Sequence, residues 1–382
     1  VSSNPTSANP APFFHARRAP GKSFILRHMP PRPTAASSRP EHRAILWLHP
    51  DQTELARAMA PLAGAAIVAA GCPAAAGRGR TTEVAAALDA EPIDDLLRTV
   101  SSVEADAILF LTAAHSSDDP FIDDPALVKA CLDRNLQIAT LEPAPASVME
   151  RARFERALGP GGPEKLRFVP AMRRSRGFKA AAEVLEHIGP LRTIAIGSRG
   201  SPAHGSLAAR LFDAMDVVLG LMGEPESIDC AISGPAPPGG VHLTPGENLR
   251  DLRGDLTAML RFGSGRSACI LLSDSAGRWF RGVTVLAHGG CLRIDDKSFE
   301  LIDPSGATAD RSRSKVSSGA ADDPPAAAAI AEQLAQMLDP RAPAPAPIDT
   351  PTALAMCEAA LLSSRTGQGE SPATILRMAG VP

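Results

Sequence analysis

Two aspartates three residues apart are the side chains in this sequence with the clearest capacity for chemistry. Asp213 and Asp216 lie within residues 206–222, whose apolar spacing predicts a helix, so both carboxylates lie on one face of it. Paired carboxylates can hold different pKa values and serve as acid and base, or their oxygens can bind a divalent cation. The alternative interpretation is that they are solvated acids on an open cleft.

Two histidines are further candidates. His115 follows the predicted strand 106–112, and ligands of doubly wound sheets bind beyond the carboxyl ends of the strands. His204 precedes the predicted helix 206–222. Isolated histidines are more often structural or surface residues than functional ones, so both interpretations remain open.

The composition excludes several kinds of site. The chain of 382 residues contains no tyrosine, which rules out catalysis by a phenol. Its six cysteines are scattered without a Cys-x-x-Cys pair, so we expect free thiols in a reducing cytoplasm rather than disulfides or a zinc site. The net charge of −3 argues against nucleic acid as the main partner. No stretch of about 18 apolar residues occurs, so no membrane span is expected.

The first 42 residues differ in composition from the rest. They are rich in Pro, Ser, Ala and Arg and contain no acidic residue before Glu41. Such a segment buries too little apolar surface to fold by itself, so we expect a disordered extension over 1–42. Met29 is an alternative start of the protein. The apolar core of a secretory signal is missing, which again favours a cytoplasmic location.

Residues 43–145 alternate short apolar strands with helices. The continuous apolar run 44–48 is typical of a strand buried on both faces, and similar runs occur at 65–70, 106–112 and 137–140. Strands that alternate with helices form a parallel sheet with right-handed crossovers. We therefore predict that this part is a Rossmann-like domain, a doubly wound parallel sheet of the dinucleotide-binding type.

Residues 146–382 have a different pattern. Seven strand-like runs separated by tight turns occur between residues 192 and 302, with the helix 206–222 among them. This pattern predicts an α+β domain with a large, mostly antiparallel open sheet, which completes an α/β fold of two domains. Two closing helices are expected at 326–338 and 352–363.

Six segments in a fixed order carry a resemblance to a known family. They are ADAILFLTAAH (105–115), ALVKACLDRNLQIATLEPAPAS (126–147), VLEHIGPLRTIAI (184–196), LFDAMDVVLGLMGEPESIDCAIS (211–233), HGGCLRIDD (288–296) and ALAMCEAALLSSRTGQ (353–368). Together they resemble the Gfo/Idh/MocA oxidoreductases, the relatives of glucose-fructose oxidoreductase and inositol dehydrogenase. The resemblance covers roughly residues 43–382.

The resemblance implies an NAD(P) cofactor in the first domain, but this chain departs from the motif that would hold it. The turn at residues 48–53 has no glycine, so its backbone cannot approach a pyrophosphate closely. Pro50 lacks an N–H donor, and Asp51 adds a carboxylate where phosphates would lie. Cys72 replaces the acidic residue that accepts the ribose hydroxyls. We therefore predict that the motif for the implied NAD(P) is lost, assign no cofactor, and regard these positions as vestigial: Leu48, His49, Asp51, Cys72, Thr112 and His115.

The resemblance also implies a catalytic lysine, histidine and aspartate. Glu142 stands in place of the lysine, which reverses the charge that would stabilise a developing alkoxide. Asp213 stands in place of the histidine, and Asp216 matches the aspartate. We expect these three acids to lie near one cleft. Arg173 and Arg174 stand where the family often has Arg-Phe, and they either bind an anionic substrate or are surface charges.

Three functions follow from these observations. The favoured hypothesis is an eroded family homologue that transfers no hydride and acts as a binding protein, scaffold or partner subunit. The first alternative is an NAD(P)-dependent oxidoreductase that acts on a sugar or cyclitol hydroxyl through a rearranged acidic site. The second is a metal-dependent sugar lyase or sugar-binding protein. We expect a small sugar-like ligand and a homo-oligomer, or pairing with a paralogue, because family members usually assemble through the second-domain sheet.

Overall fold

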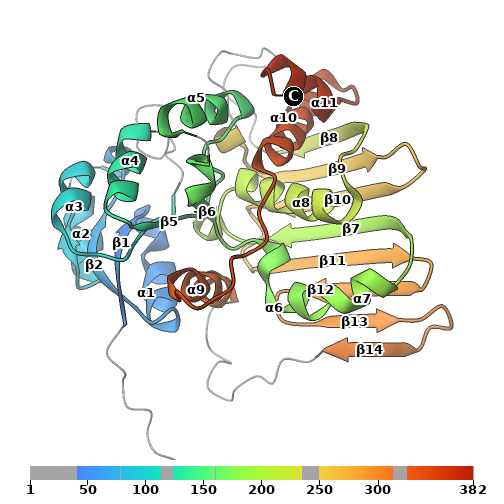
Figure 1. Cartoon of the computed structure of the whole chain (residues 1–382), viewed down its shortest axis with the longest axis horizontal. Coiled ribbons are helices and arrows are strands. Elements are labelled where there is room, and N and C mark those ends of the chain that lie inside the picture. The colour runs from blue at the N-terminus through green and yellow to red at the C-terminus, as the bar shows by residue number, and fades with distance from the viewer. Residues whose placement is uncertain are drawn as a thin grey trace, which may run out of the picture. The chain divides into compact units, whose positions relative to one another are not determined.

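A parallel sheet forms the N-terminal part of the chain (Figure 1). The computed structural model describes residues 41–77, 79–112, 124–159, 161–234, 249–312 and 325–381, so the predicted extension 1–42 lies almost wholly outside the described residues. The strands follow the order β3-β2-β1-β4-β5-β6, and all of them run in parallel. They are β1 (His42–Trp47), β2 (Ala65–Gly71), β3 (Glu91–Pro92), β4 (Ala107–Phe110), β5 (Gln137–Thr140) and β6 (Leu166–Phe168).

Helices cover both faces of this sheet, which is why its strands are apolar on both sides. Alternate residues of β1 pack into two separate hydrophobic clusters, with Leu46 in one and Ile45 in the other. The first cluster takes side chains from α1 (Thr53–Leu62), α2 (Arg80–Ala87) and α9 (Pro325–Leu338). The second takes them from α3 (Leu96–Ser102), α4 (Pro125–Asp133) and α5 (Val148–Leu158).

A second, larger sheet follows, in the order β14-β13-β12-β11-β7-β10-β9-β8. All its neighbours pair antiparallel except β10 with β7. The strands are β7 (Leu191–Arg199), β8 (Ser227–Ser233), β9 (Asp255–Arg261), β10 (Ser267–Ser273), β11 (Phe280–Ala287), β12 (Gly290–Asp295), β13 (Phe299–Ile302) and β14 (Thr308–Ser312). The two sheets confirm the predicted fold class.

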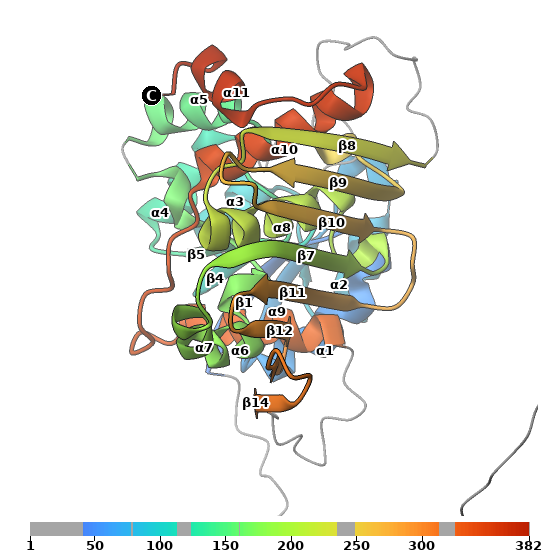
Figure 2. The same cartoon turned by 90° about the vertical axis from the view of Figure 1, so that its right-hand side faces the viewer.

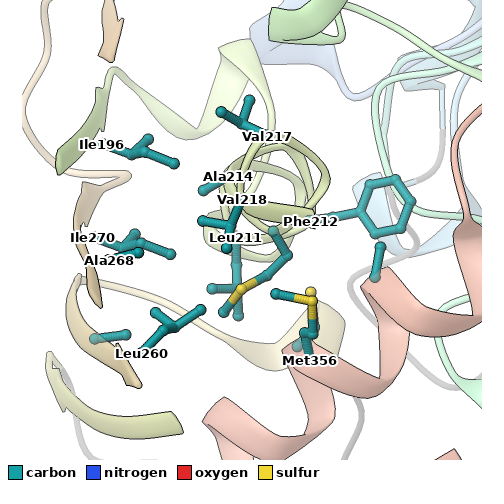
Figure 3. Close-up of a cluster of buried hydrophobic side chains, with 14 of the residues drawn as sticks. Ile196, Leu211, Phe212, Ala214, Val217, Val218, Leu260, Ala268, Ile270 and Met356 are labelled. Atoms are coloured by element: carbon teal, nitrogen blue, oxygen red, sulfur yellow. The ribbon is translucent and has the colours of Figure 1, made fainter. Parts of the chain in front are cut away.

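Helices pack on one face of the large sheet, and no described helix covers the other face, which is called the uncovered face below (Figure 2). The buried face holds α8 (Leu207–Met222) and α10 (Thr350–Thr366), whose side chains meet those of the sheet, for example Leu211, Ile270 and Met356 (Figure 3). The shorter helices are α6 (Arg176–Ala180), α7 (Ala182–His187) and α11 (Pro372–Met378). Among the helices described, none is long and apolar enough to cross a bilayer.

Two features of the fold differ from the simple division at residue 145. The parallel sheet takes a sixth strand, β6, from beyond that point, and it pairs with β5. The closing helix α9 packs against the first sheet, where Ile330 and Leu334 join the hydrophobic cluster around Leu46. The segment from α9 to α10 therefore returns the chain from the first sheet to the second.

Candidate functional site

The three predicted acids are buried rather than solvated. Glu142, Asp213 and Asp216 are 3%, 6% and 1% exposed. The two aspartates are enclosed because 13 of the 16 residues of α8 are buried. The interpretation that they are solvated acids on an open cleft is therefore wrong, and each buried carboxylate needs a partner.

Glu142 is bound to the first residue before α8. Its carboxylate accepts a hydrogen bond from the backbone N–H of Ser206 at 2.9 Å and a second from the Ser206 hydroxyl. Ser206 is the N-cap of α8, and its Oγ accepts a hydrogen bond from the N–H of Ala209 at 3.1 Å. Burial raises the pKa of Glu142, and the bonds from Ser206 oppose that shift. Glu142 thus stabilises the N-terminus of α8, where a negative charge is favourable.

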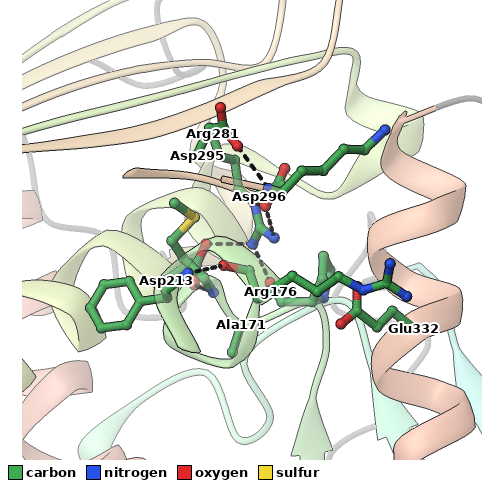
Figure 4. Close-up of polar contacts among 12 residues, drawn as sticks. Ala171, Arg176, Asp213, Arg281, Asp295, Asp296 and Glu332 are labelled. Carbon is green, nitrogen blue, oxygen red and sulfur yellow. Dashed lines mark hydrogen bonds and ion pairs between the residues drawn. The ribbon is translucent and has the colours of Figure 1, made fainter. Parts of the chain in front are cut away.

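Asp213 belongs to a buried ion-pair network (Figure 4). Its Oδ1 accepts a hydrogen bond from the N–H of Met172 at 2.6 Å, and its Oδ2 lies 2.8 Å from Nη1 of Arg281. Arg281 also donates to Asp296, at 2.9 Å from Nε and 2.6 Å from Nη2. Burial raises the pKa of Asp213, whereas Arg281 lowers it. Both oxygens of this carboxylate are therefore engaged within the protein.

Asp216 has a different environment. Its Oδ2 lies 3.4 Å from Nε of Arg173, an ion pair, yet neither carboxylate oxygen accepts a hydrogen bond from the described residues. Burial raises its pKa to about 7, with Arg173 lowering it and Asp213 raising it. With that pKa, the Asp216 carboxyl group can exchange a proton close to neutral pH.

The structure brings the two aspartates together but leaves Glu142 apart. Asp213 and Asp216 face the same short turn of 3-10 helix, η5 (Met172–Arg174), as their shared helix face predicts. Ser206, which holds Glu142, precedes Asp213 by seven residues, or roughly 10 Å along the helix at 1.5 Å per residue. The three acids therefore do not share one cleft. Glu142 lies at the N-terminus of α8, and the two aspartates lie further along the helix.

Three backbone N–H groups of the turn after β1 donate hydrogen bonds within the turn itself. The N–H of His49 donates to Oε1 of Gln52 at 2.9 Å, the N–H of Gln52 donates to the carbonyl of His49 at 2.9 Å, and the N–H of Thr53 donates to the carbonyl of Pro50. Nδ1 of His49 lies 2.7 Å from Oδ1 of Asp51. Leu48 is fully buried at the end of the strand.

Gln52 is a residue that sequence reasoning missed. It is 3% exposed, and its Nε2 donates to the carbonyl of Leu111 at 2.7 Å and to that of Ala203 at 3.2 Å. Leu111 follows β4, so this side chain lies where β1 and β4 part, the switch point at which ligands of such sheets bind. The only signal in the sequence was a polar residue within the turn at residues 48–53, and that signal is weak.

The remaining cofactor positions lie along the same edge of the sheet. Cys72 follows β2, is 4% exposed, and its Sγ lies 3.3 Å from Oγ1 of Thr81. Thr112 follows β4 and is 3% exposed. His115 lies outside the described residues. Cys72 is thus a buried thiol in contact with α2, as expected for a free cysteine.

An aromatic and cationic cluster lies near the first turn of α8. The ring of Trp279 has the guanidinium carbons of Arg210 and Arg281 at 5.5 Å and 5.1 Å from its centroid, and the His204 ring edge-on at 6.0 Å. Its Nε1 donates to Asp296 at 2.9 Å. Burial, and then Arg210, lowers the pKa of His204, which favours the neutral imidazole. The Trp-x-Arg spacing could have revealed this cluster, because Trp279 directly precedes β11, Arg281 lies on it, and residues two apart in an extended chain share a side.

No metal-binding cluster of three or more His, Cys, Asp or Glu occurs among the residues that the structure describes. The acids instead bind backbone, hydroxyl and guanidinium groups of the protein itself. Glu142 and Asp213 have hydrogen-bond partners on both carboxylate oxygens, whereas Asp216 has an ion pair with Arg173 and a pKa raised to about 7.

Comparison with known proteins identifies the architecture. No family model matches this sequence, and no curated protein matches it. Solved structures do match. An oxidoreductase from Agrobacterium radiobacter, solved with NAD+, L-tartaric acid and magnesium, is 14% identical, with a TM-score of 0.61 over 88% of this chain and 100% of that one. The chain has the fold of the Gfo/Idh/MocA oxidoreductases.

Two further structures support this assignment of the Gfo/Idh/MocA fold. A myo-inositol dehydrogenase from Corynebacterium glutamicum is 18% identical, with a TM-score of 0.57 over 86% of this chain and 98% of that one. Biliverdin reductase from Synechocystis, solved with biliverdin and NADP+, is 15% identical, with a TM-score of 0.55 over 85% and 99%. Because those proteins carry different chemistries on one fold, the function of this chain must be argued from its own site.

Proposed function

We propose that this protein is a Gfo/Idh/MocA-type homologue that transfers no hydride and acts as a ligand-binding protein or partner subunit. The observation that carries the proposal is the turn after β1. A dinucleotide pyrophosphate needs free backbone N–H groups and a close approach to the start of the following helix. Here Pro50 has no N–H, and His49, Gln52 and Thr53 donate inside the turn.

The charge of the turn also argues against the binding of a dinucleotide. The Asp51 carboxylate lies in this turn, where it would repel two phosphates. The buried side chain of Gln52 bridges the carbonyls of Leu111 and Ala203 at the switch point of the sheet. A dinucleotide that entered there would have to break those hydrogen bonds.

The position where a substrate would react also lacks the lysine that the resemblance implies. Glu142 stands where the resemblance places a lysine, and its carboxylate is bound to Ser206. A carboxylate opposes the negative charge that develops on a substrate oxygen during hydride removal. The residues present therefore do not fit NAD(P) or its reaction.

The test is a titration of the protein with NADH and NADPH, in which binding is measured by fluorescence and by calorimetry. The Agrobacterium radiobacter oxidoreductase, which was solved with NAD+, is the matched positive control. We expect no saturable binding of either nucleotide to this chain at concentrations that saturate the control. A dissociation constant in the micromolar range would overturn the proposal.

The alternative is a working oxidoreductase for a sugar or cyclitol hydroxyl. One property of Asp216 supports this alternative, because a carboxyl group with a pKa of about 7 suits a general base. Turnover of any polyol with either nucleotide, lost in Asp216→Asn, would establish this alternative and exclude the favoured function.

We also propose that the uncovered face of the large sheet is where a second copy, or a paralogue, binds. Apolar side chains there are unusually accessible, with Met259, Leu271 and Phe280 exposed by 45%, 54% and 44%. They line a cavity of about 1090 Å³ on the sheet. Exposed apolar surfaces of this kind mark interaction sites.

A further inference from the structure

A second cavity lies on the side of α8 that faces η5 and α6. Its volume is about 250 Å³. Residues 339–349, which connect α9 to α10 and are called the strap below, form one of its walls. The lining residues are Arg173, Arg174, Phe178, Asp216, Gly220, Leu221, Ala346 and Ile348.

The guanidinium of Arg173 lies against the backbone of α8. A Cβ atom added at Gly220 would lie 2.1 Å from its Nη1, so the absence of a side chain at Gly220 makes room for this group. Arg173 is 21% exposed in its side chain and, within the described part of the chain, has one polar contact, the ion pair with Asp216. Its remaining donors can therefore serve a ligand in the cavity.

Arg174 supplies a second guanidinium to the same cavity. Its Nη2 donates to the carbonyl of Ala346 in the strap at 3.1 Å. An arginine side chain has five N–H donors, and this one uses a single donor on the described residues. Among the described residues, most of its donors therefore have no acceptor and can serve a ligand.

Asp216 is the residue that indicates a missing hydrogen-bond donor in the cavity. The residue is 1% exposed, and both of its carboxylate oxygens are buried without a hydrogen bond. Buried polar groups in folded proteins nearly always have such a bond, because an unsatisfied one is costly. A hydroxyl group of a ligand would supply it.

We propose that this cavity binds a small hydroxycarboxylate, whose carboxylate contacts Arg173 and Arg174 and whose hydroxyl bonds to Asp216. Guanidinium groups match carboxylates in charge and in planar geometry. Two guanidiniums and one carboxylate leave the cavity with a net charge of 2 − 1 = +1 when Asp216 is ionised. That sign favours an anion over a zwitterion such as an amino acid.

The size and lining of the cavity set the other limits. Drug-sized ligands occupy roughly 300–1,000 Å³, so a cavity of about 250 Å³ suits a smaller molecule. Phe178, Leu221 and Ile348 provide apolar contacts for a short carbon chain. L-Lactate has the required carboxylate, neighbouring hydroxyl and short chain, and it is the probe we choose.

Binding of an anion here should be coupled to protonation of Asp216. The charged groups that face this acid are Arg173 and Arg174 from η5, Asp213 from α8 and Asp349 before α10. With a pKa of about 7, Asp216 is partly protonated at neutral pH, and an anion beside it favours the protonated form. The affinity for L-lactate should therefore rise about several-fold from pH 8 to pH 6, with uptake of protons.

The experiment is calorimetric titration of the full chain with L-lactate at low ionic strength. It is repeated in two buffers of different ionisation enthalpy, which reveals proton uptake. Propionate lacks the hydroxyl and should bind about tenfold more weakly, the value of one hydrogen bond of about 1.4 kcal/mol. Lactamide lacks the charge and should not bind. Absence of L-lactate binding at millimolar concentrations at both pH values would overturn the proposal.

Three variants locate the binding. Gly220→Ala places its methyl group on Arg173 while improving helix propensity, so the fold should persist and L-lactate binding should be lost. Asp216→Asn should abolish the proton uptake. Arg98→Gln removes an exposed arginine elsewhere and should change nothing. Thermal melting checks that each variant is folded, and unchanged binding in folded Gly220→Ala would refute this location.

Discussion

The carboxylate of Glu142 accepts two hydrogen bonds from Ser206, one from the backbone N–H and one from the hydroxyl of the residue that caps α8. Glu142 follows β5 of the parallel sheet, and Ser206 is the N-cap of α8, which packs on the large sheet. This contact therefore joins the two parts of the fold. A residue that resemblance places in a catalytic position here has a structural partner.

Replacement of Glu142 should therefore affect stability. Glu142→Ala leaves the N–H and hydroxyl of Ser206 without their acceptor, and we expect the free energy of unfolding to fall by about 1–3 kcal/mol. Glu142→Gln keeps an acceptor oxygen and should cost less. Urea denaturation measures both, with the exposed Glu224→Ala as the control. A Glu142→Ala protein as stable as the wild type would show that the contact is unimportant.

Asp216 should make stability depend on pH. Its pKa is about 7 in the folded protein and near 3.8 in the unfolded chain, so between those values the folded state binds more protons. The contribution of Asp216 to stability is therefore full below about pH 4 and is lost as the pH rises toward 7. Asp216→Asn lacks this dependence, so it should gain on the wild type by at most roughly 1.4 kcal/mol per pH unit up to pH 7.

Urea denaturation of both proteins at pH 5, 6, 7 and 8 measures that difference. It should change between pH 5 and 7 and level off by pH 8. A stability difference that stays constant over the whole range would contradict the raised pKa of Asp216.

Arg281 should matter more than either carboxylate that it binds. Its removal takes the ion-pair partner from both Asp213 and Asp296, whereas removal of Asp213 leaves Arg281 paired with Asp296. Breaking a buried ion pair costs about 3–5 kcal/mol. We expect Arg281→Met to reach that range and Asp213→Asn to cost less, by chemical denaturation. The opposite order would mean that the network is not held by its arginine.

The uncovered sheet face should control assembly. Leu271→Glu introduces a charge into the most exposed apolar position of that face, so an oligomer seen for the wild type by light scattering should become a monomer. Met149→Glu is the matched control, because Met149 is 58% exposed on α5. An oligomer that survives Leu271→Glu but not Met149→Glu would place the interface elsewhere.

The sequence was informative where the pattern is local. Alternating strands and helices predicted the parallel sheet, and Asp213 and Asp216 do share a helix face. Contacts between distant residues could not be predicted in this way. Gln52 reaches Ala203 across 151 positions, and Glu142 reaches Ser206 across 64. Nothing in the spacing of either residue indicates its partner, so the three acids were expected in one cleft although Glu142 lies apart.

The position of α9 constrains the order in which the protein can fold during synthesis. Ile330 and Leu334 of α9 cover the first sheet beside Leu46, although all the strands of the second sheet are synthesised before α9. A nascent chain that has emerged only to residue 145 would display that apolar surface to other molecules. The N-terminal half should therefore require chaperone protection until translation has passed residue 338, and it should aggregate when expressed alone.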